Sequence, residues 1–598
     1  MSIIQFKEAN CKNCYKCIRS CPVKAIAFQN EQARIVEEDC MLCGNCLKAC
    51  PQNAKTVKSD IDTVKSFINQ KEKVYVSLAP SFISAFDDGT YLFSALKKLG
   101  FTDAFETAIG AMAVSRQYER LMGERKMKNI ITTACPSINF LIEKYYPELI
   151  GQMAPVVSPM IAHAKILKST YGQGIRVVFI GPCLSKKDEC NDLQNEGAID
   201  AVLTFEELDG WLEAEGLIKE GSFTQEVRVS GNITARSYPI PGGILQTIDD
   251  KYKANYKCIG IDGVDRCIKV LDSIRDDGIE NYFIEMNSCQ GGCISGPCMN
   301  EVKGGFLTAR ERLVEYVKRA SEEENSIQAR ADDDPIQAYA DGNPIQAHTD
   351  GKPFLDFDAD KELYKKFLNR RKKYEIPSEA VLQGILNSIG KFTKDKELNC
   401  GACGYPTCRD KAIAVYNNKA QLHMCLPYMR ERAESISNLI INTTPNAIFA
   451  LDSELKIQEI NMAAREKFGL SMEDIVGENI YDLLECEDFI DVLESHTSIY
   501  DKKYYYEKLQ MTVEQSVIFI PEQNVIIAII KDITEEERLR LRTQRKQAEN
   551  VELAQKVIDK QMRVAQEIAS LLGETTAETK VALTKLKKSI MAGMDDIK

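Results

Sequence analysis

The sequence is poor in long apolar runs, in basic charge and in recognisable targeting segments. No apolar stretch among its 598 residues approaches the roughly 18 residues that a membrane span needs, and no secretory signal is recognisable. We therefore expect a cytoplasmic protein that makes no membrane contact. The formal net charge of -12 and the lack of a basic stripe argue against nucleic acid as a direct partner.

Cysteine is what the sequence has in quantity. Most of its 21 cysteines stand in tight groups, and grouped cysteines in a cytosolic chain indicate metal binding rather than a disulfide framework. At 598 residues the chain is also long enough for several domains. We therefore expect a multidomain metalloprotein, and the cysteine groups described below imply an anaerobe or a low-oxygen cell.

Residues 1–60 contain two runs with the spacing Cys-x2-Cys-x2-Cys-x3-Cys-Pro. Such runs are typical of bacterial ferredoxins with two [4Fe-4S] clusters, in which the fourth cysteine of each run ligates the other cluster. The predicted ligands are Cys11, Cys14, Cys17 and Cys50 for the first cluster and Cys40, Cys43, Cys46 and Cys21 for the second. A pair of zinc sites is the alternative, although zinc ribbons need only two close cysteines per half and no proline after a fourth. Two cubes held close together would form an electron relay.

From about residue 72 the sequence alternates apolar, strand-like runs with helical stretches, which predicts a domain of α/β layers over residues 72–320. The clearest strands begin at Val74 and Arg176, and a loop of small residues follows each. The second of these strands ends immediately before Cys183. We expect this cysteine on a loop at the carboxyl end of a strand, where open α/β sheets build their sites.

Three short cysteine motifs lie in this domain, at residues 132–136, 181–189 and 285–293. In order and in flanking residues they resemble the three loops that hold the active-site cluster (H-cluster) of the [FeFe]-hydrogenases. The resemblance implies a [4Fe-4S] cube with the ligands Cys135, Cys183, Cys289 and Cys293. Cys293 would also bridge to a [2Fe] subsite carrying CO, cyanide (CN) and an azadithiolate, and Lys186 would donate a hydrogen bond to a cyanide nitrogen. Four unrelated buried cysteines are the alternative.

The sequence departs from this family along the proton path. The usual proton-donating cysteine, next to the first ligand, is replaced by Ala134, and alanine cannot carry a proton. Active relatives place relay glutamates on the helix after residue 107, where only Glu119 lies near. Cys298, five residues past the bridging cysteine, is either an alternative relay group or a packing residue. The resemblance therefore implies a low turnover.

Residues 321–355 repeat a nine-residue unit, and their proline, glycine and acidic residues predict a turn-rich linker. Residues 356–432 follow, and they resemble a small helical [4Fe-4S] domain found in redox proteins of anaerobes. The predicted ligands of this fourth cube are Cys400, Cys403, Cys408 and Cys425. Zinc is the competing metal, because four thiolates also satisfy zinc.

Residues 435–534 resemble a PAS domain, with two short strands, a helix opened by Asn461 and later strands that close at Thr534. The only histidine of this domain, His496, gives little support for a haem ligand. Residues 535–598 are strongly charged and carry one apolar helical stripe, which we expect to meet a second copy in a homodimer. No histidine-kinase phosphoacceptor region or ATP site is recognisable, so we expect output through contact with a downstream signalling protein.

The segments together resemble a sensory [FeFe]-hydrogenase, the group that couples the H-cluster domain to a PAS module. The implied fold is multidomain α+β and α/β, with a two-cluster ferredoxin domain, a two-lobed α/β H-cluster domain, a small helical Fe-S domain, a PAS α+β domain and C-terminal helices. The implied function is slow, reversible conversion of H2 to protons, with a redox partner such as ferredoxin and with the redox state relayed through four [4Fe-4S] clusters to the PAS domain. Two alternatives stay open: a catalytic hydrogenase whose PAS domain serves only dimerisation, and a non-catalytic Fe-S electron-transfer or scaffold protein without the two-iron site.

Overall fold

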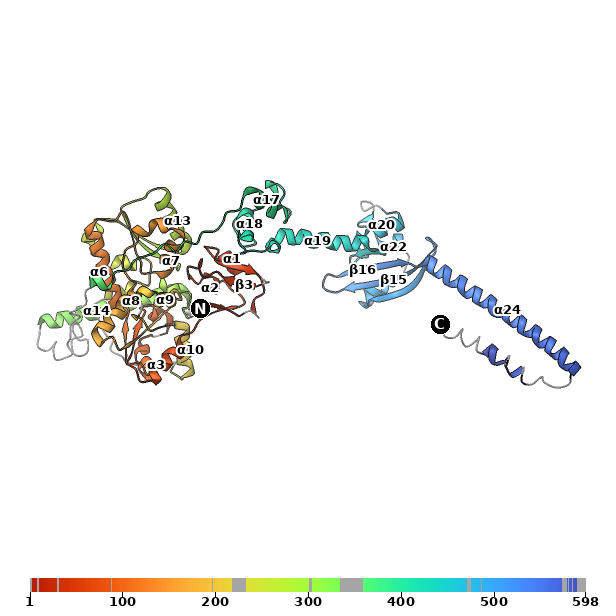
Figure 1. The fold of residues 1–598 in the computed structure, drawn as a ribbon, viewed down its shortest axis with the longest axis horizontal. Coiled ribbons are helices and arrows are strands. Elements are labelled where there is room, and N and C mark those ends of the chain that lie inside the picture. The colour runs from red at the N-terminus through yellow and green to blue at the C-terminus, as the bar shows by residue number, and fades with distance from the viewer. Residues whose placement is uncertain are drawn as a thin grey trace. The chain divides into compact units, whose positions relative to one another are not determined.

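The protein, seen in a computed structural model, contains two compact units, residues 1–428 and residues 429–598. Figure 1 shows the helices and strands of both. The structure describes residues 3–7, 10–29, 32–87, 89–195, 197–217, 233–300, 304–333, 359–470, 475–484, 487–572, 578, 580–582 and 584–588. Among these residues, no helix is both long enough and apolar enough to cross a membrane.

The N-terminal segment forms two small antiparallel strand pairs and two short helices. β1 pairs with β4 and β2 pairs with β3, with the bounds Ile4–Phe6 (β1), Lys55–Val57 (β4), Ile26–Gln29 (β2) and Gln32–Ile35 (β3). The helices are α1 (Lys16–Ser20) and α2 (Asn45–Lys48), each of which lies within one of the two cysteine runs. Because β1 and β4 stand at opposite ends of this segment, their pairing folds the second cysteine run back beside the first.

The α/β domain is built on two parallel sheets. The first has the strand order β6-β5-β8-β9, with the bounds Val74–Leu78 (β5), Asp103–Glu106 (β6), Arg176–Gly181 (β8) and Ala201–Thr204 (β9). The second has the order β10-β11-β7, with the bounds Ile130–Ile131 (β7), Lys257–Asp262 (β10) and Tyr282–Asn287 (β11). All five residues of β5 are buried, as expected of a strand inside a parallel sheet.

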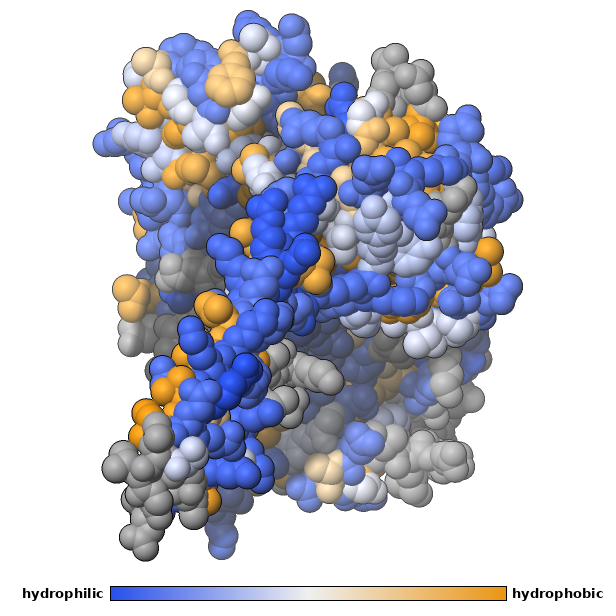
Figure 2. Space-filling view, turned by 90° about the vertical axis from the view of Figure 1, so that its right-hand side faces the viewer, coloured by the Kyte–Doolittle hydropathy of each residue, from blue (hydrophilic) through white to orange (hydrophobic). Residues whose placement is uncertain are grey.

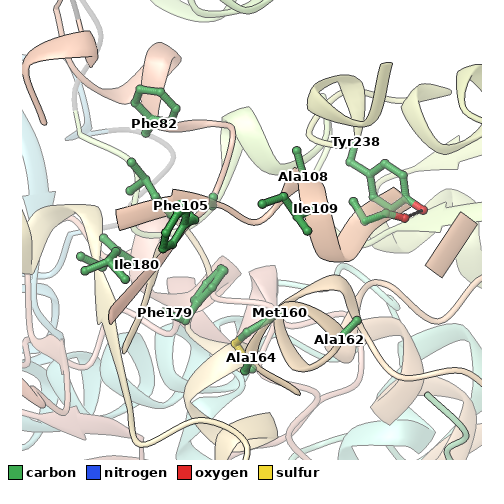
Figure 3. Close-up of a cluster of buried hydrophobic side chains, with 14 of the residues drawn as sticks. Phe82, Phe105, Ala108, Ile109, Met160, Ala162, Ala164, Phe179, Ile180 and Tyr238 are labelled. Carbon is green, nitrogen blue, oxygen red and sulfur yellow. Dashed lines mark hydrogen bonds between the residues drawn. The ribbon is translucent and has the colours of Figure 1, made fainter. Parts of the chain in front are cut away.

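The largest hydrophobic core packs against the first sheet. Figure 3 shows Phe105 and Phe179 of this sheet close to Met160, which lies on α8 (Pro159–Tyr171). Helix α6 (Ala108–Glu124) crosses α8 at Gly110, where an added Cβ would lie 2.3 Å from the carbonyl oxygen of Pro159. The close approach of the two helices therefore requires glycine at this position.

Helix α14 (Gly305–Asp333) follows the second sheet and extends into the segment expected to be a turn-rich linker. Residues 321–333 are helical rather than turn-rich, and the reason is that the first proline of the segment is Pro335. The proline-containing repeats, residues 334–358, lie outside the described residues.

The last part of the first unit is a small helical domain. Its helices are α17 (Glu379–Asn387) and α18 (Cys408–Tyr416), and a short 3-10 turn follows at Leu422–Met424. Thr407 begins α18 with a capping box, in which its hydroxyl accepts from the backbone N–H of Asp410 and the carboxylate of Asp410 accepts from the N–H of Thr407. Helix α19 (Leu426–Thr443) starts directly after Cys425.

The second unit contains a five-stranded antiparallel sheet with the order β13-β12-β16-β15-β14. The strand bounds are Ala447–Leu451 (β12), Ile457–Ile460 (β13), Ile499–Tyr506 (β14), Met511–Ile520 (β15) and Val525–Asp532 (β16). The expected helix at Asn461 is confirmed, since the side-chain oxygen of this residue accepts from the N–H of Ala464 at the start of α20 (Met462–Phe468). The predicted fold class, with a mixed α/β domain, a ferredoxin domain and a PAS domain, is confirmed.

A long helix, α24 (Thr534–Leu572), leaves the last strand of this sheet. Figure 2 shows apolar side chains along one edge of an otherwise hydrophilic helix. The apolar side chains of α24 with more than 40% of their surface exposed are Leu539, Leu541, Leu553, Val557, Val564 and Ile568.

Candidate metal centres

The three cysteine motifs of the α/β domain all lie on loops at the carboxyl ends of parallel strands. Cys183 follows β8 of the first sheet, as predicted from the sequence. Cys135 follows β7 and caps α7 (Pro136–Tyr145), and the third motif follows β11, so these two come from the second sheet. The thiols of the two lobes therefore share one site, at the edge where α/β sheets bind their ligands.

Hydrogen bonds and mutual electrostatic effects show that the four thiols lie close together. The thiol of Cys135 donates to the hydroxyl of Ser288 at 3.7 Å, and that hydroxyl lies 3.9 Å from the sulfur of Cys289. Burial raises the pKa of the Cys289 thiol to about 12, and the nearby thiols of Cys183 and Cys135 add to the rise. The pKa of Cys293 is raised by burial and then by the same three thiols. A group of half-buried thiols that oppose one another's ionisation needs positive charge to ionise, which iron supplies.

Lys186 reaches this group from the second motif. Its Nζ lies 2.8 Å from Oε2 of Glu189 and 3.4 Å from the carbonyl oxygen of Ala134. The hydroxyl of Ser158 donates to the same oxygen of Glu189 at 2.9 Å. Glu189 therefore holds the ammonium against the loop of the first motif. The sequence analysis assigned no role to Glu189, although its position three residues after Lys186 on a helix is a usable signal.

The eight N-terminal cysteines surround two separate cavities. One is lined by Cys21, Cys40, Cys43 and Cys46, and the other by Cys11, Cys14, Cys17 and Cys50. Each cavity therefore takes its fourth cysteine from the other run, as the spacing predicts. The first cavity faces the α/β domain, where the hydroxyl of Ser137 donates to the carbonyl of Leu42 at 3.1 Å.

The cysteines of the helical domain gather around a buried lysine. Lys411 on α18 donates to the carbonyl oxygen of Leu422 at 2.7 Å. Burial lowers the pKa of Lys411, while the thiols of Cys425, Cys403 and Cys408 act in the opposite direction. The ring of His423 packs edge-on against Phe28, with a centroid distance of 6.2 Å, which matches a packing role.

These donor sets suit iron-sulfur clusters in chemistry and in number. Cubes are held by four thiolates, and the structure groups the predicted ligands four by four. Within the described residues, no three His, Cys, Asp or Glu side chains converge closely enough to hold a single metal ion. The ligand roles stay predictions, and the structure brings together the residues they require.

The two candidate relay residues lie in different surroundings. Glu119 accepts from the backbone N–H of Asp249 at 2.8 Å, in an exposed hydrogen bond. Cys298 is fully buried, and burial raises its pKa. It packs with Leu184 and with Cys46 of the N-terminal segment. The surroundings of Cys298 are those of a packing residue.

Glu285, the first residue of the third motif, is a buried acid to which the sequence analysis assigned no role. Its carboxylate accepts from the backbone N–H groups of Gly242, Ile244 and Leu245, at 2.9 to 3.2 Å. Burial nevertheless raises its pKa to about 7, which outweighs these hydrogen bonds. The acid is fully buried four residues before Cys289, so it changes charge near neutral pH beside the third motif.

We expect a carboxylic-acid band of Glu285 in the infrared spectrum that disappears as the pH rises through about 7. Because the pKa in the folded chain lies above its ordinary value of 4.5, this group stabilises the fold below pH 4.5 and loses that contribution as the pH rises to 7. The full loss corresponds to about 3 kcal/mol. Glu285→Gln should remove the band and this part of the pH dependence. A carboxylate already ionised at pH 5 would contradict the prediction.

Four family descriptions match separate parts of the chain. Residues 72–297 match "Iron only hydrogenase large subunit, C-terminal domain", and residues 3–51 match "4Fe-4S dicluster domain". Residues 397–427 match "Putative Fe-S cluster", and residues 438–514 match "PAS fold".

Several known proteins are similar to parts of the chain. Iron hydrogenase 1 of Clostridium pasteurianum is 25% identical over 41% of this chain, which spans about half (53%) of that relative's length. The periplasmic [Fe] hydrogenase large subunit of Nitratidesulfovibrio vulgaris is 28% identical over 52% of this chain and 89% of its own length. The cytosolic Fe-S cluster assembly factor NAR1 of Encephalitozoon cuniculi is 25% identical over 33% of this chain and 59% of its own length.

Two solved structures align with parts of the chain. [FeFe]-hydrogenase HydA1 from Chlamydomonas reinhardtii aligns over 53% of this chain and all of its own, with 16% identity and a TM-score of 0.38. The PAS domain of nitrogen regulation protein NR(II) from Vibrio parahaemolyticus aligns over 16% of this chain and 98% of its own, with 23% identity and a TM-score of 0.15.

Proposed function

The chain is an [FeFe]-hydrogenase-like protein with a PAS domain, and we propose that it senses H2 in the cytoplasm rather than consuming or producing it at a high rate. The observation that carries the proposal is Ala134. This residue directly precedes the first predicted ligand, Cys135, and its carbonyl oxygen lies 3.4 Å from Nζ of Lys186. The resemblance leads us to expect a thiol at this position. Every predicted ligand is retained, whereas the group that would move protons is missing.

The residues of the site have distinct tasks in this proposal. Cys135, Cys183, Cys289 and Cys293 would hold the cube, and Cys293 would also link the two-iron subsite to it. Lys186, held by Glu189, would donate to a cyanide ligand and so orient the subsite. When bound, the two-iron subsite would supply the open metal position at which H2 is split. The methyl group of Ala134 neither holds nor passes a proton, so proton movement limits the rate.

A slow site suits a sensor. When turnover is low, the H2 pressure sets the fraction of clusters that are reduced rather than a flux of electrons. A second domain can respond to that fraction. In this proposal the PAS domain responds, a ferredoxin exchanges electrons with the clusters, and a downstream signalling protein receives the output. Support comes from the PAS fold that residues 438–514 match.

The test compares infrared spectra of the matured protein under H2 and under inert gas with its H2 turnover. CO and cyanide bands report directly on the two-iron subsite. A sensor should show bands that shift with H2 at low turnover. High turnover would instead favour a catalytic hydrogenase whose PAS domain serves dimerisation, as the similarity to two hydrogenases allows.

The second candidate is a non-catalytic Fe-S protein, and the similarity to an Fe-S cluster assembly factor favours it. Such a protein would carry cubes without the two-iron subsite. Retention of both Cys293 and Lys186 speaks against this candidate, because bridging to a second metal unit and donating to a cyanide ligand are tasks that arise only when the subsite is present. The absence of CO and cyanide bands after maturation would decide in its favour.

We expect the matured protein to contain about eighteen irons per chain, four from each of four cubes and two from the binuclear subsite. Protein produced without maturation should contain about sixteen. A Cys403→Ser variant of the helical domain should lose about four irons and keep the infrared bands. An iron content near eight, together with stoichiometric zinc, would show that half of the cysteines hold zinc.

A further inference from the structure

The helical domain packs directly on helix α1 and strand β2 of the N-terminal segment. A guanidinium nitrogen of Arg19 donates to the carbonyl oxygen of Ala402 at 3.1 Å, and the N–H of Phe28 donates to the carbonyl oxygen of Lys419 at 2.9 Å. Tyr405 and Met424 are buried in the same hydrophobic cluster as Ile18 of α1. Two segments almost 400 residues apart in sequence therefore share one core.

The closest approach lies at Gly404, which directly follows the predicted ligand Cys403. Gly404 has a φ of +97°, and a Cβ on it would lie 2.6 Å from Cγ2 and 3.0 Å from Cβ of Ile18. The backbone nitrogen of Arg19 would lie 3.3 Å away. Ile18 itself is fully buried. Only glycine lets the cysteine loop of the helical domain rest on the turn of α1 between Cys17 and Cys21.

Tyr405 lies between predicted ligands of two different cubes. Its side chain is 4% exposed, and its hydroxyl has no hydrogen-bond partner among the described residues. Tyr405 packs in the same hydrophobic cluster as Cys21, and Cys403 packs against that cluster. The ammonium of Lys24 donates to the carbonyl oxygen of Ile18 at 3.2 Å. The cysteine loop of the helical domain thus stands beside the helix that carries Cys17 and ends before Cys21.

A second set of contacts holds the two parts in this position. The ammonium of Lys419 pairs with the nearly buried carboxylate of Asp39, and the same carboxylate accepts from the hydroxyl of Tyr374 at 2.6 Å. Lys419 also lies 3.7 Å from the ring centroid of Tyr374. The hydroxyl of Tyr145 on α7 donates to the carbonyl oxygen of Asp39 at 2.8 Å. Asp39 therefore joins the helical domain, the N-terminal segment and the α/β domain next to Cys40.

We propose that Ile18, Arg19, Gly404 and Tyr405 form an electron-transfer junction, which lets the cube held by the helical domain exchange electrons directly with the N-terminal cubes, whose predicted ligands Cys17 and Cys21 flank this contact in sequence and pack in the same cluster. In each transfer one cube is oxidised by one electron and the other is reduced by one electron. No bond changes and no proton moves. The source of electrons is H2 at the α/β domain, so the physiological role of the junction rests on the proposed function.

The junction lies beside both N-terminal cavities. Ile18 and Phe28, which contact the helical domain, line the cavity of Cys11, Cys14, Cys17 and Cys50, whereas Cys21 lines the other cavity. That other cavity also faces the α/β domain through Leu42 and Ser137. The last predicted ligand of the helical domain, Cys425, directly precedes helix α19, which leads along the chain to the PAS domain. In this proposal, electrons that leave the H2 site reach the cube nearest in sequence to the PAS domain through the N-terminal cubes.

The test is electron paramagnetic resonance on the full-length protein carrying all its cubes, reduced stepwise with a europium(II) chelate. The dipolar coupling between two reduced clusters falls with the third power of the distance between them. Adjacent clusters therefore broaden each other's signals. We expect the signal of the helical-domain cube to be split or broadened when the neighbouring cube is reduced. The Cys403→Ser variant should remove this interaction and leave the signals of the N-terminal cubes.

Two glycines of the same loop provide matched variants. Gly401 and Gly404 both have positive φ, so alanine strains the backbone at either position. An added Cβ at Gly401 has only the carbonyl oxygen of Tyr405, at 3.9 Å, within contact distance, whereas one at Gly404 strikes Ile18. Gly404→Ala should weaken the interaction severalfold at unchanged iron content. Gly401→Ala should leave it as in the unmodified protein.

Two results would overturn the proposal. One is a set of fully reduced cubes with no magnetic interaction that depends on Cys403. The other is a helical-domain cube that stays oxidised under the strongest reductant, because such a cube cannot accept electrons from its neighbour. Neither measurement needs the two-iron subsite or H2. A failure here is therefore separate from a failure of the proposed function, because that function is tested by the infrared bands and by the H2 turnover.

Discussion

Replacing Ala134 with cysteine should raise H2 turnover by about a hundredfold, the typical contribution of a positioned general acid or base. The new thiol would stand next to the predicted ligand Cys135 and on the residue whose carbonyl oxygen lies 3.4 Å from Nζ of Lys186. Ala134 is only partly buried at the edge of the main core, so one additional atom causes no severe overlap. The measurement is H2 oxidation and evolution by matured Ala134→Cys and unmodified protein at equal iron content.

Ala134→Ser is the matched control, because it adds an atom of similar position with a far weaker acid. Its turnover should stay close to that of the unmodified protein. The infrared bands should be retained in both variants, which shows that the subsite is still bound. If cysteine leaves the turnover unchanged while the bands persist, protons already move by another route. Glu119 and Cys298 would then be the next positions to replace.

Removal of residues 535–598 should convert a homodimer into a monomer at low micromolar concentration. The apolar stripe predicted on this segment consists of Leu553, Val557, Met562, Ala565, Ile568 and Leu572. In the structure, Leu553, Val557 and Ile568 are between 52% and 62% exposed on α24. Two such helices can bury these side chains against each other in a parallel coiled coil. Each buried large side chain contributes about 1.5 to 3 kcal/mol before the entropy cost of association, so five or six per chain favour the dimer by several kcal/mol.

Light scattering of the full-length and truncated proteins measures the change. A finer test is Val557→Glu, which places a charge in the stripe, with Gln566→Glu as control at an exposed position on the opposite side of the helix. The first substitution should weaken the dimer and the second should not. H2 chemistry should be unchanged in all of these proteins, since every predicted cluster ligand precedes Leu426. A full-length monomer, or a truncation that abolishes the infrared bands, would contradict this division of the chain.

The residues that can bind metal were predictable from the sequence because cysteine spacing is local. A run such as Cys11 to Cys21 specifies a tight loop followed by a helix, and the structure has α1 at that place. The strand before Cys183 was predictable in the same way, since an apolar run bounded by small residues leaves few alternatives. The turn-rich linker from residue 321 was the exception. The prediction used the composition of the whole segment, 321–355. Its first 13 residues contain no proline and are helical.

The sequence by itself determined the kinds of ligand, their order and the domain types, because these depend on side-chain chemistry and on short-range backbone geometry. Only the tertiary structure decided which distant groups meet. Lys186 meets the carbonyl oxygen of Ala134 because helix α9 (Ser185–Cys190) is packed against the loop of the first motif. Glu285 has a pKa raised to about 7 because the packing of β11 removes it from water. Tyr405 packs with Cys21 because a glycine permits two domains to touch. Burial and contact between segments hundreds of residues apart arise from the packing of whole elements, which no local pattern records.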